Sequence, residues 1–269
     1  MVDMPLEDIF LDLTLFAERL RTYYIGRKIE MVREIVSTQL AVLRKAEEGE
    51  EEGFVLVADR QSSGRGRKGD RWYSPPGTGL YLSLLLRPTF QPWSILPLSI
   101  GLSVAQGIEA AAGLTPSLKW PNDIMLEDRK VAGILVESQV QEGRLLGVVA
   151  GIGVNVADPE AGWPADLADT AIGVGAGVAR EELLAELLNS IELNYDLLRE
   201  GRTDRVLAEY RRRCAQHPGD PILVSRPDKA AEQATVVQIE PDGALLIECR
   251  DGSQERLYGE QITSLRGTR

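Results

Sequence analysis

Residues 54–86 read FVLVADRQSSGRGRKGDRWYSPPGTGLYLSLLL, two apolar runs separated by a loop rich in glycine and arginine. The loop contains the spacing G-x-G-x-x-G at Gly64, Gly66 and Gly69, which in a dinucleotide-binding fold leads straight into a helix. Here the Pro75–Pro76 pair follows, which removes backbone donors and fixes φ. The glycines are therefore predicted to lie in a long loop between two strands, and not in a dinucleotide-binding turn.

The composition narrows the chemistry that the chain can perform. Its 269 residues suffice for one large domain, or for one domain and a small satellite. The formal net charge is -11, so the overall field repels nucleic acid. A single histidine, His217, excludes histidine-based triads and multi-histidine zinc sites. The basic loop is therefore predicted to bind an anion small enough to fit one site.

The N-terminus and the cysteines predict a cytoplasmic protein with no membrane partner. No apolar stretch is long enough and free enough of charge to be expected to span a bilayer. Residues 1–16, MVDMPLEDIFLDLTLF, carry acidic side chains where a signal peptide carries basic ones. Cys214 and Cys249 are far apart in sequence, which favours reduced thiols over a disulfide or a metal site.

Hydrophobic periodicity predicts alternating helices and strands up to residue 213. The predicted helical segments are 4–24, 37–49, 96–112 and 180–213, the last with one or two helices. The predicted strands are 26–35, 54–58, 79–88, 117–123, 130–140 and 144–156. This alternation predicts an α+β fold, in which a mixed β-sheet has helices packed on one face.

The pattern changes after residue 218. Short runs of Val, Ile and Leu are separated by PDG at 241–243 and RDGS at 250–253, both typical of tight hairpins. We therefore predict a large domain over residues 1–218, to which the chemistry is assigned, and a small all-β domain, a barrel, over 219–269. Within the large domain, residues 1–28 are expected to be an N-terminal helical extension.

Several short segments contain side chains suited to an anion site. They are residues 37–38, 61–72, 119–123, 130–135 and 151–155. Their cations are Arg65, Arg67, Lys119 and Lys130. Trp72 offers a stacking surface, and Asp123 alone could hold Mg²⁺ if phosphate oxygens supply the other ligands. The set suits a polyphosphate beside a small carboxylate, because cations neutralise the charge that develops on leaving pyrophosphate.

Four motifs in this order resemble those of the biotin–protein ligases. They are Q-x-x-G-R-G-R-x-G-x-x-W-x-S at 61–74, K-W-P-N-D at 119–123, K-x-x-G-I-L-x-E at 130–137 and G-x-G-x-N at 151–155. The resemblance extends over about residues 30 to 160, and the C-terminal β region agrees in place and size. It implies a catalytic domain similar to class II synthetases, followed by an SH3-like β-barrel.

The resemblance implies a two-step ligase reaction. ATP and Mg²⁺ would convert biotin to biotinyl-5′-AMP, and a lysine of a biotin carboxyl carrier protein, such as that of acetyl-CoA carboxylase, would then accept the biotinyl group. The loop at 61–74 would fold over biotin and the adenylate. Some relatives carry an N-terminal helix-turn-helix domain. Only about thirty residues precede the match here, so we predict a short form of the ligase without this domain. It is expected to bind no operator or other nucleic acid. We expect the protein to be a monomer or a homodimer.

The resemblance also assigns residues to biotin. Those expected to bind it are Ser37, Thr38, Gln61, Gly64, Arg65, Lys130 and Gly133. Lys130 would hold the biotin carboxylate near phosphorus and stabilise the developing oxyanion; the alternative is a surface lysine in a turn. Ser37 could instead serve only as a helix cap. The family's S-T-x-A/N pattern reads STQL here, so the contact beyond Thr38 is open.

A second set is assigned to ATP by the same resemblance. Its members are Arg67, Trp72, Lys119, Asn122, Asp123, Asn155 and Arg266, with Asp123 also the metal ligand. Arg67 would contact phosphate oxygens in a bidentate manner, through two of its guanidinium nitrogens, and is counted with Lys130 as catalytic. Trp72 would either stack on adenine or anchor the loop. Asn155 would contact the adenine edge or cap a turn.

Two other functions are weighed against this one. A lipoate–protein ligase has a related fold and parallel chemistry, but its R-R-x-S-G-G-G type of loop differs from the alternating Gly and Arg found here. An RNA-binding protein could use a Gly/Arg loop. It would, however, need basic residues spread over a face with interleaved aromatic residues, which the net charge of -11 disfavours.

Overall fold

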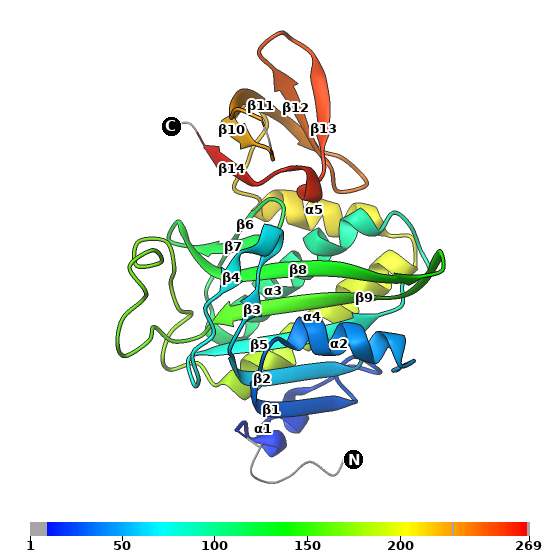
Figure 1. The fold of residues 1–269 in the computed structure, drawn as a ribbon, viewed down its shortest axis with the longest axis vertical. Coiled ribbons are helices and arrows are strands. Elements are labelled where there is room, and N and C mark those ends of the chain that lie inside the picture. Colours follow the sequence, from blue (N-terminus) through cyan, green and yellow to red (C-terminus); the bar gives the residue numbers. More distant parts are fainter. Residues whose placement is uncertain (1–9, 228, 268–269) are drawn as a thin grey trace.

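A mixed β-sheet forms the main layer of the computed structural model, which describes residues 10–227 and 229–267 (Figure 1). The sheet has seven strands in the order β1-β2-β5-β9-β8-β7-β6. Their bounds are β1 Ile29–Ile35, β2 Val55–Gln61, β5 Gly79–Leu86, β6 Ser117–Lys119, β7 Asp123–Leu126, β8 Arg129–Gln141 and β9 Arg144–Asn155. β1 and β2 run parallel, and the other neighbours run antiparallel. The predicted mixed sheet is confirmed.

Helices cover both faces of this sheet. α3 (Leu96–Ala112) and α4 (Arg180–Arg199) lie behind it in Figure 1, whereas α2 (Thr38–Glu47) lies in front. Leu84 belongs to the larger core, which includes the residues of α3 and α4, and its neighbour Leu85 belongs to a separate cluster with residues of α2. The fold class is as predicted, but the single helical face is a simplification, because β5 is buried on both sides.

α3 is apolar on nearly every side. Contrary to our expectation, Trp93–Ala112 is long and apolar enough to cross a membrane by length and composition alone. In the fold, most of this segment is buried inside the protein. At Gly107 the helix approaches α4 so closely that a Cβ atom would lie 2.9 Å from the backbone nitrogen of Leu187. The apolar composition is therefore that of a core helix.

The N-terminal helix is shorter than predicted. α1 spans Leu13–Arg19, and Asp12 caps it by accepting hydrogen bonds from the backbone N–H groups of Thr14 and Leu15. Residues 4–9 of the predicted helix lie outside the described residues. The helix ends because later backbone groups bind α4 instead: the N–H of Arg21 donates to the Asn189 side chain at 2.7 Å.

A buried carboxylate fastens the segment after α1. Glu192 on α4 is 5% exposed and accepts hydrogen bonds from the N–H groups of Tyr23, Tyr24 and Ile25 at 2.5, 3.0 and 2.9 Å. These three N–H groups lie beyond the end of α1 and have no helical partner, and the one carboxylate satisfies all of them. The N-terminal extension is therefore part of the large domain's packing.

The described residues after 218 form a five-stranded antiparallel sheet. Its strands are β10 Pro221–Ser225, β11 Glu232–Ile239, β12 Leu245–Cys249, β13 Gln254–Leu257 and β14 Ser264–Gly267, in the order β13-β12-β11-β10-β14. The predicted hairpins are confirmed, with Gly243 and Gly252 at φ +87° and +82°. Between the described parts of β13 and β14 no ladder is formed, so a closed barrel stays a prediction.

The two sheets share one core. The indole N–H of Trp120 donates to the carbonyl of Gly243 at 3.0 Å, and the Ser94 hydroxyl donates to that of Asp242 at 2.7 Å. One continuous apolar cluster includes residues of both sheets. α5 (Thr203–Arg213) lies between them in Figure 1. The division of the chain into two domains at residue 218 stays a proposal. Because the two sheets share one core, substitutions test this division better than deletions do.

We predict that Glu192→Gln lowers the free energy of unfolding by about 2 kcal/mol, measured by urea denaturation. The substitution places an NH₂ group opposite backbone N–H donors and removes a charge-assisted bond. Glu48→Gln, at the exposed end of α2, is the matched control and should change stability by less than about 0.5 kcal/mol. Equal stability of the two variants would contradict this role of Glu192.

Candidate functional site

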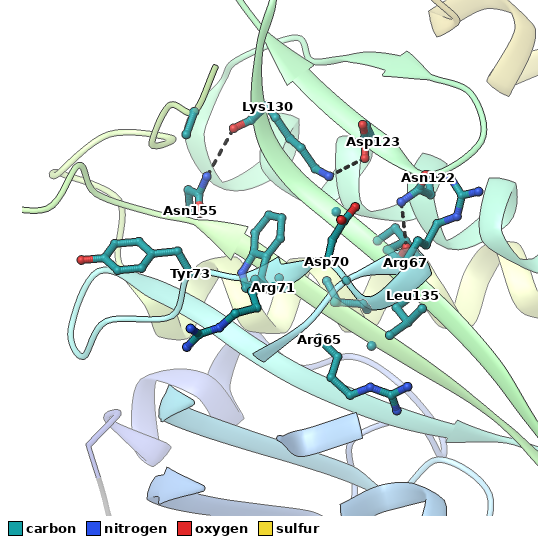
Figure 2. Close-up of a pocket in the computed structure, with 18 of the residues that line it drawn as sticks. Arg65, Arg67, Asp70, Arg71, Tyr73, Asn122, Asp123, Lys130, Leu135 and Asn155 are labelled. Carbon is teal, nitrogen blue, oxygen red and sulfur yellow. Dashed lines mark hydrogen bonds and ion pairs between the residues drawn. The ribbon is translucent and has the colours of Figure 1, made fainter. Parts of the chain in front are cut away.

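A cavity of about 620 Å³ lies between the Gly/Arg loop and the sheet (Figure 2). The predicted site residues that line it are Ser37, Thr38, Gln61, Arg65, Arg67, Trp72, Lys119, Asn122, Asp123, Lys130, Gly133 and Asn155. Two predicted residues are not among the described lining residues. Gly64 lies at the base of the loop, and Arg266 is exposed on β14. The segments at 37–38 and 151–155, more than a hundred residues apart in the sequence, therefore meet around one space.

The Gly/Arg loop folds into a small hairpin. β3 (Gly64–Arg65) pairs with β4 (Arg71–Trp72) through a 3₁₀ turn at Arg67–Gly69. A Cβ atom on Gly64 would lie 2.5 Å from the carbonyl oxygen of Trp72. Gly64 therefore permits the two strands to approach, which is a steric reason for this glycine of the motif.

Trp72 packs on glycines of the sheet. A Cβ atom at Gly153 would lie 2.4 Å from the indole, and one at Gly133 would lie 3.0 Å from it. The ammonium of Lys130 lies 5.3 Å from the ring centroid. The structure thus shows the anchoring role for Trp72, and stacking on adenine stays a prediction.

Ser37 and Thr38 present hydroxyls at the start of α2. Ser37 occupies the N-cap position, but in the described structure its side chain forms no capping hydrogen bond. Its Oγ is buried and has no partner among residues 10–227 and 229–267. Thr38 is joined to Gln61, whose Oε1 accepts from the Thr38 backbone N–H at 2.9 Å. The helix-cap interpretation of Ser37 is therefore wrong, and its hydroxyl is available to a ligand.

Lys130 faces into the cavity. Its ammonium lies 2.6 Å from Oδ1 of Asp123, and both side chains are largely buried, at 33% and 24% exposed. Figure 2 shows the two facing one another, with Asn155 donating to the carbonyl of Lys130 at 3.3 Å. The alternative of a solvated surface lysine is therefore wrong. Lys119, which also lines the cavity, has no carboxylate partner within the described chain.

Arg67 joins the hairpin to the second sheet. Its guanidinium donates to Oδ1 of Asn122 at 2.8 Å and to the carbonyls of Gly259 and Ile262. Burial lowers the pKa of Arg67 from its usual value, but a guanidinium remains charged at physiological pH. Lys68 donates to the carbonyl of Glu260 beside it. The sequence predicted a phosphate contact for Arg67 and missed this bridge.

Arg65 is held by a different partner. Its guanidinium is ion-paired with Glu137 at 3.2 Å, and its side chain is 39% exposed. Glu137 is the last residue of the K-x-x-G-I-L-x-E motif. Two of the motifs are therefore joined by a direct ion pair, which places Arg65 at the rim of the cavity.

Sequence reasoning missed one wall of the site. The cavity is also lined by Trp163, Asp166, Leu167, Thr170 and Ala171, from the long connection between β9 and α4. The Trp163 ring lies edge-on to Tyr73 of the Gly/Arg loop, with centroids 6.3 Å apart. A tryptophan in a polar loop directly after G-x-G-x-N was the available signal.

The chain is similar to known proteins over the part of the sequence that contains most of these site residues. The sequence profile described as the Biotin/lipoate A/B protein ligase family matches residues 32–155. The Biotin--[acetyl-CoA-carboxylase] ligase of Mycobacterium tuberculosis is 32% identical over 195 residues, which cover 70% of this chain and 71% of that protein. The chain belongs to the biotin protein ligase family.

Solved structures of this family have the same fold. The biotin protein ligase from Aquifex aeolicus in complex with biotin and ATP superposes with a TM-score of 0.76 at 30% identity, covering 90% of this chain and 100% of that one. The Bifunctional ligase/repressor BirA of Bacillus spizizenii is 37% identical over 182 residues, 65% of this chain. The family member described here spans only 56% of the length of that relative.

We predict that Gly153→Ala loosens the hairpin, because the added methyl group would displace the Trp72 indole. Trypsin should then cleave within 65–71 about 10-fold faster, which corresponds to a loss of about 1.4 kcal/mol in docking of the loop. Mass spectrometry of the fragments measures this rate. Gly101→Ala is the control, since its Cβ would meet no described atom within 4 Å. Equal cleavage rates in both variants would exclude the steric role of Gly153.

Proposed function

We propose that this chain joins biotin to a lysine of a biotin carboxyl carrier protein, using ATP. One observation supports this most directly. A single cavity is lined both by the hydroxyls of Ser37 and Thr38, suited to a polar head group, and by the cations Arg67, Lys119 and Lys130, suited to a carboxylate and phosphates.

In the first proposed step, a carboxylate oxygen of biotin attacks the α-phosphorus of ATP. An acyl–phosphate bond forms, the bond to pyrophosphate breaks, and biotinyl-5′-AMP remains. Lys130 would hold the carboxylate and reduce its repulsion by the phosphates. Arg67 and Lys119 would compensate charge that develops on the leaving pyrophosphate.

In the second step, the amine of the carrier lysine attacks the acyl carbon and AMP leaves. A mixed anhydride reacts with water, so the site has to exclude solvent until the carrier arrives. The hairpin and the segment around Trp163 line two sides of the cavity and meet at the Tyr73–Trp163 contact. This contact supports a protected intermediate.

Asp123 is the residue that would hold Mg²⁺. Its Oδ1 is buried, and within the described chain the ammonium of Lys130, 2.6 Å away, is its one partner. No group of three or more His, Cys, Asp or Glu suited to a metal occurs in residues 10–227 and 229–267. A cation that takes its other ligands from phosphates fits this donor set. When bound, it would neutralise phosphate charge.

The proposal includes the biological setting of the reaction. The Mycobacterium tuberculosis relative is named for acetyl-CoA carboxylase, and we extend that carrier class to this chain. We expect the protein to work in the cytoplasm without nucleic acid, as a monomer or homodimer. The arginines at 211–213 support the absence of a nucleic-acid patch, since Arg212 and Arg213 pair with Glu209 and Arg211 donates to the carbonyl of Ile239.

The matching family profile covers lipoate ligases as well as biotin ligases, so lipoate is the second candidate substrate. The pocket chemistry favours biotin. A dithiolane ring offers no strong hydrogen-bond partner, and it would leave the buried hydroxyl of Ser37 unsatisfied at a cost of about 1 to 3 kcal/mol. A cyclic urea offers both donors and an acceptor.

Calorimetry with the two acids tests the substrate. We expect biotin to bind and lipoate to bind at least about 100-fold more weakly. The dithiolane of lipoate would leave polar groups of the pocket, such as the Ser37 hydroxyl, without a hydrogen-bond partner. Binding of lipoate in preference to biotin would replace the proposed function by the lipoate alternative.

Lys130→Ala tests the first step. We expect the rate of biotin-dependent exchange of pyrophosphate into ATP to fall by about 100-fold or more. The variant lacks the cation that would stabilise negative charge while the biotin carboxylate attacks the α-phosphorus. Lys28→Ala is the control, because Lys28 is ion-paired with Glu50 and does not line the cavity. Exchange at the control's rate would show that Lys130 takes no part in adenylation.

A further inference from the structure

A chain of hydrogen bonds leads from Thr38 to the backbone of strand β9 in the main sheet. The hydroxyls of Thr38 and Ser83 lie 2.9 Å apart. Ser83 donates to Oε1 of Gln39 at 3.2 Å, and Nε2 of Gln39 donates to the backbone carbonyl of Val149 at 3.2 Å. All three side chains line the cavity, and each is at most 3% exposed.

A second chain leads from Thr38 to the Gly/Arg loop. The Thr38 hydroxyl lies 3.2 Å from Oε1 of Gln61, which also accepts from the Thr38 N–H. Nε2 of Gln61 donates to the Ser74 hydroxyl at 3.1 Å, and Ser74 donates to the carbonyl of Trp72 at 3.1 Å. This chain, too, ends on a backbone carbonyl.

The carbonyls determine the direction of every bond. A carbonyl can only accept, so the NH₂ group of Gln39 faces Val149 and its oxygen faces Ser83. Ser83 donates its single proton to Gln39 and can only accept from Thr38. Gln61 likewise presents its oxygen to Thr38. Both neighbours of the Thr38 hydroxyl are therefore acceptors, its proton points into the protein, and the capacity left for a ligand is that of an acceptor.

The adjacent Ser37 has the complementary property. Its residue is 1% exposed, and its Oγ has no partner in the described part of the chain. It is therefore free to donate to a ligand carbonyl. The pocket then combines a free donor at Ser37 with an enforced acceptor at Thr38, which matches a carbonyl flanked by an N–H group.

We propose that Gln39 and Ser83 are positioning residues that hold the Thr38 hydroxyl as a hydrogen-bond acceptor, so that the pocket selects a cyclic head group with an N–H donor. The inference rests on the proposed function and specifies how the urea of biotin is distinguished. Gly151 contributes to the same arrangement of Thr38, Ser83 and Gln39. A Cβ atom there would lie 2.5 Å from Oε1 of Gln39, so this glycine allows the amide its place.

Calorimetric titration with biotin tests the positioning residues. In Gln39→Leu, the proton of Ser83 loses its acceptor and turns to Thr38, where it competes with the ligand N–H. Biotin should bind about 10-fold more weakly. In a Ser83→Ala background, which itself weakens binding modestly, adding Gln39→Leu should have no further effect because no proton remains to redirect. Additive losses would overturn the proposal and indicate a merely structural role.

A ligand-side measurement on the unaltered chain covers the case in which the variants do not fold. Two cyclic carbamate analogues of biotin replace one or the other ureido N–H by oxygen at nearly the same size. At least one should bind about 100-fold more weakly than biotin, since it would set two acceptors face to face at Thr38. If both bind as tightly as biotin, the acceptor role is wrong. If biotin itself does not bind, the proposed function fails instead.

Discussion

The close approach of Trp72 to the sheet is the constraint on which the site depends. The indole can lie there only because Gly153 and Gly133 have no side chain beneath it, since a Cβ atom would stand 2.4 and 3.0 Å from its ring atoms. With the indole in place, the hairpin forms one wall of the cavity and Lys130 lies against the ring. A larger residue at Gly153 would lift the hairpin and open the cavity, because packed interiors leave no room for an added methyl group without displacement.

The same hairpin connects the two sheets. Arg67 and Lys68 donate to carbonyls of residues 259–262, and Arg67 also binds Asn122 of the K-W-P-N-D motif. Hydrogen bonds from a charged donor stabilise by about 1.5–3 kcal/mol each, so the second sheet contributes to the position of the loop. The C-terminal part of the chain therefore contributes to the site, because its backbone carbonyls hold Arg67, the arginine that we assign to phosphate. The position of the hairpin and the arrangement of the two sheets are therefore coupled through the side chains of Arg67 and Lys68.

Several elements could be predicted from the sequence with little error. The helix at 96–112 has the predicted bounds, and the two Asp-Gly turns connect the strands expected on either side. The predictions that failed depended on neighbours. α1 is short because its continuing N–H groups bind Asn189 and Glu192, and α2 occupies the face that was expected to be open. Trp163 was missed because its loop has no periodicity to indicate which way it folds.

The sequence by itself determined most of the succession of strands and helices along the chain, the family and the residue types around the cavity, because periodicity, turn residues and motif spacing are local properties. It did not indicate the short strands β3 and β4 or the separate strand β7. Only the tertiary structure decided which atoms meet. Nothing in the sequence indicates that Ser37 keeps a free hydroxyl, that Gln39 reaches Val149, or that Arg67 reaches Ile262. These contacts join residues up to 195 positions apart. Hydrogen-bond direction and steric clearance are set by distances of a few ångströms between such segments, and those distances exist only once the sheet and its loops have packed.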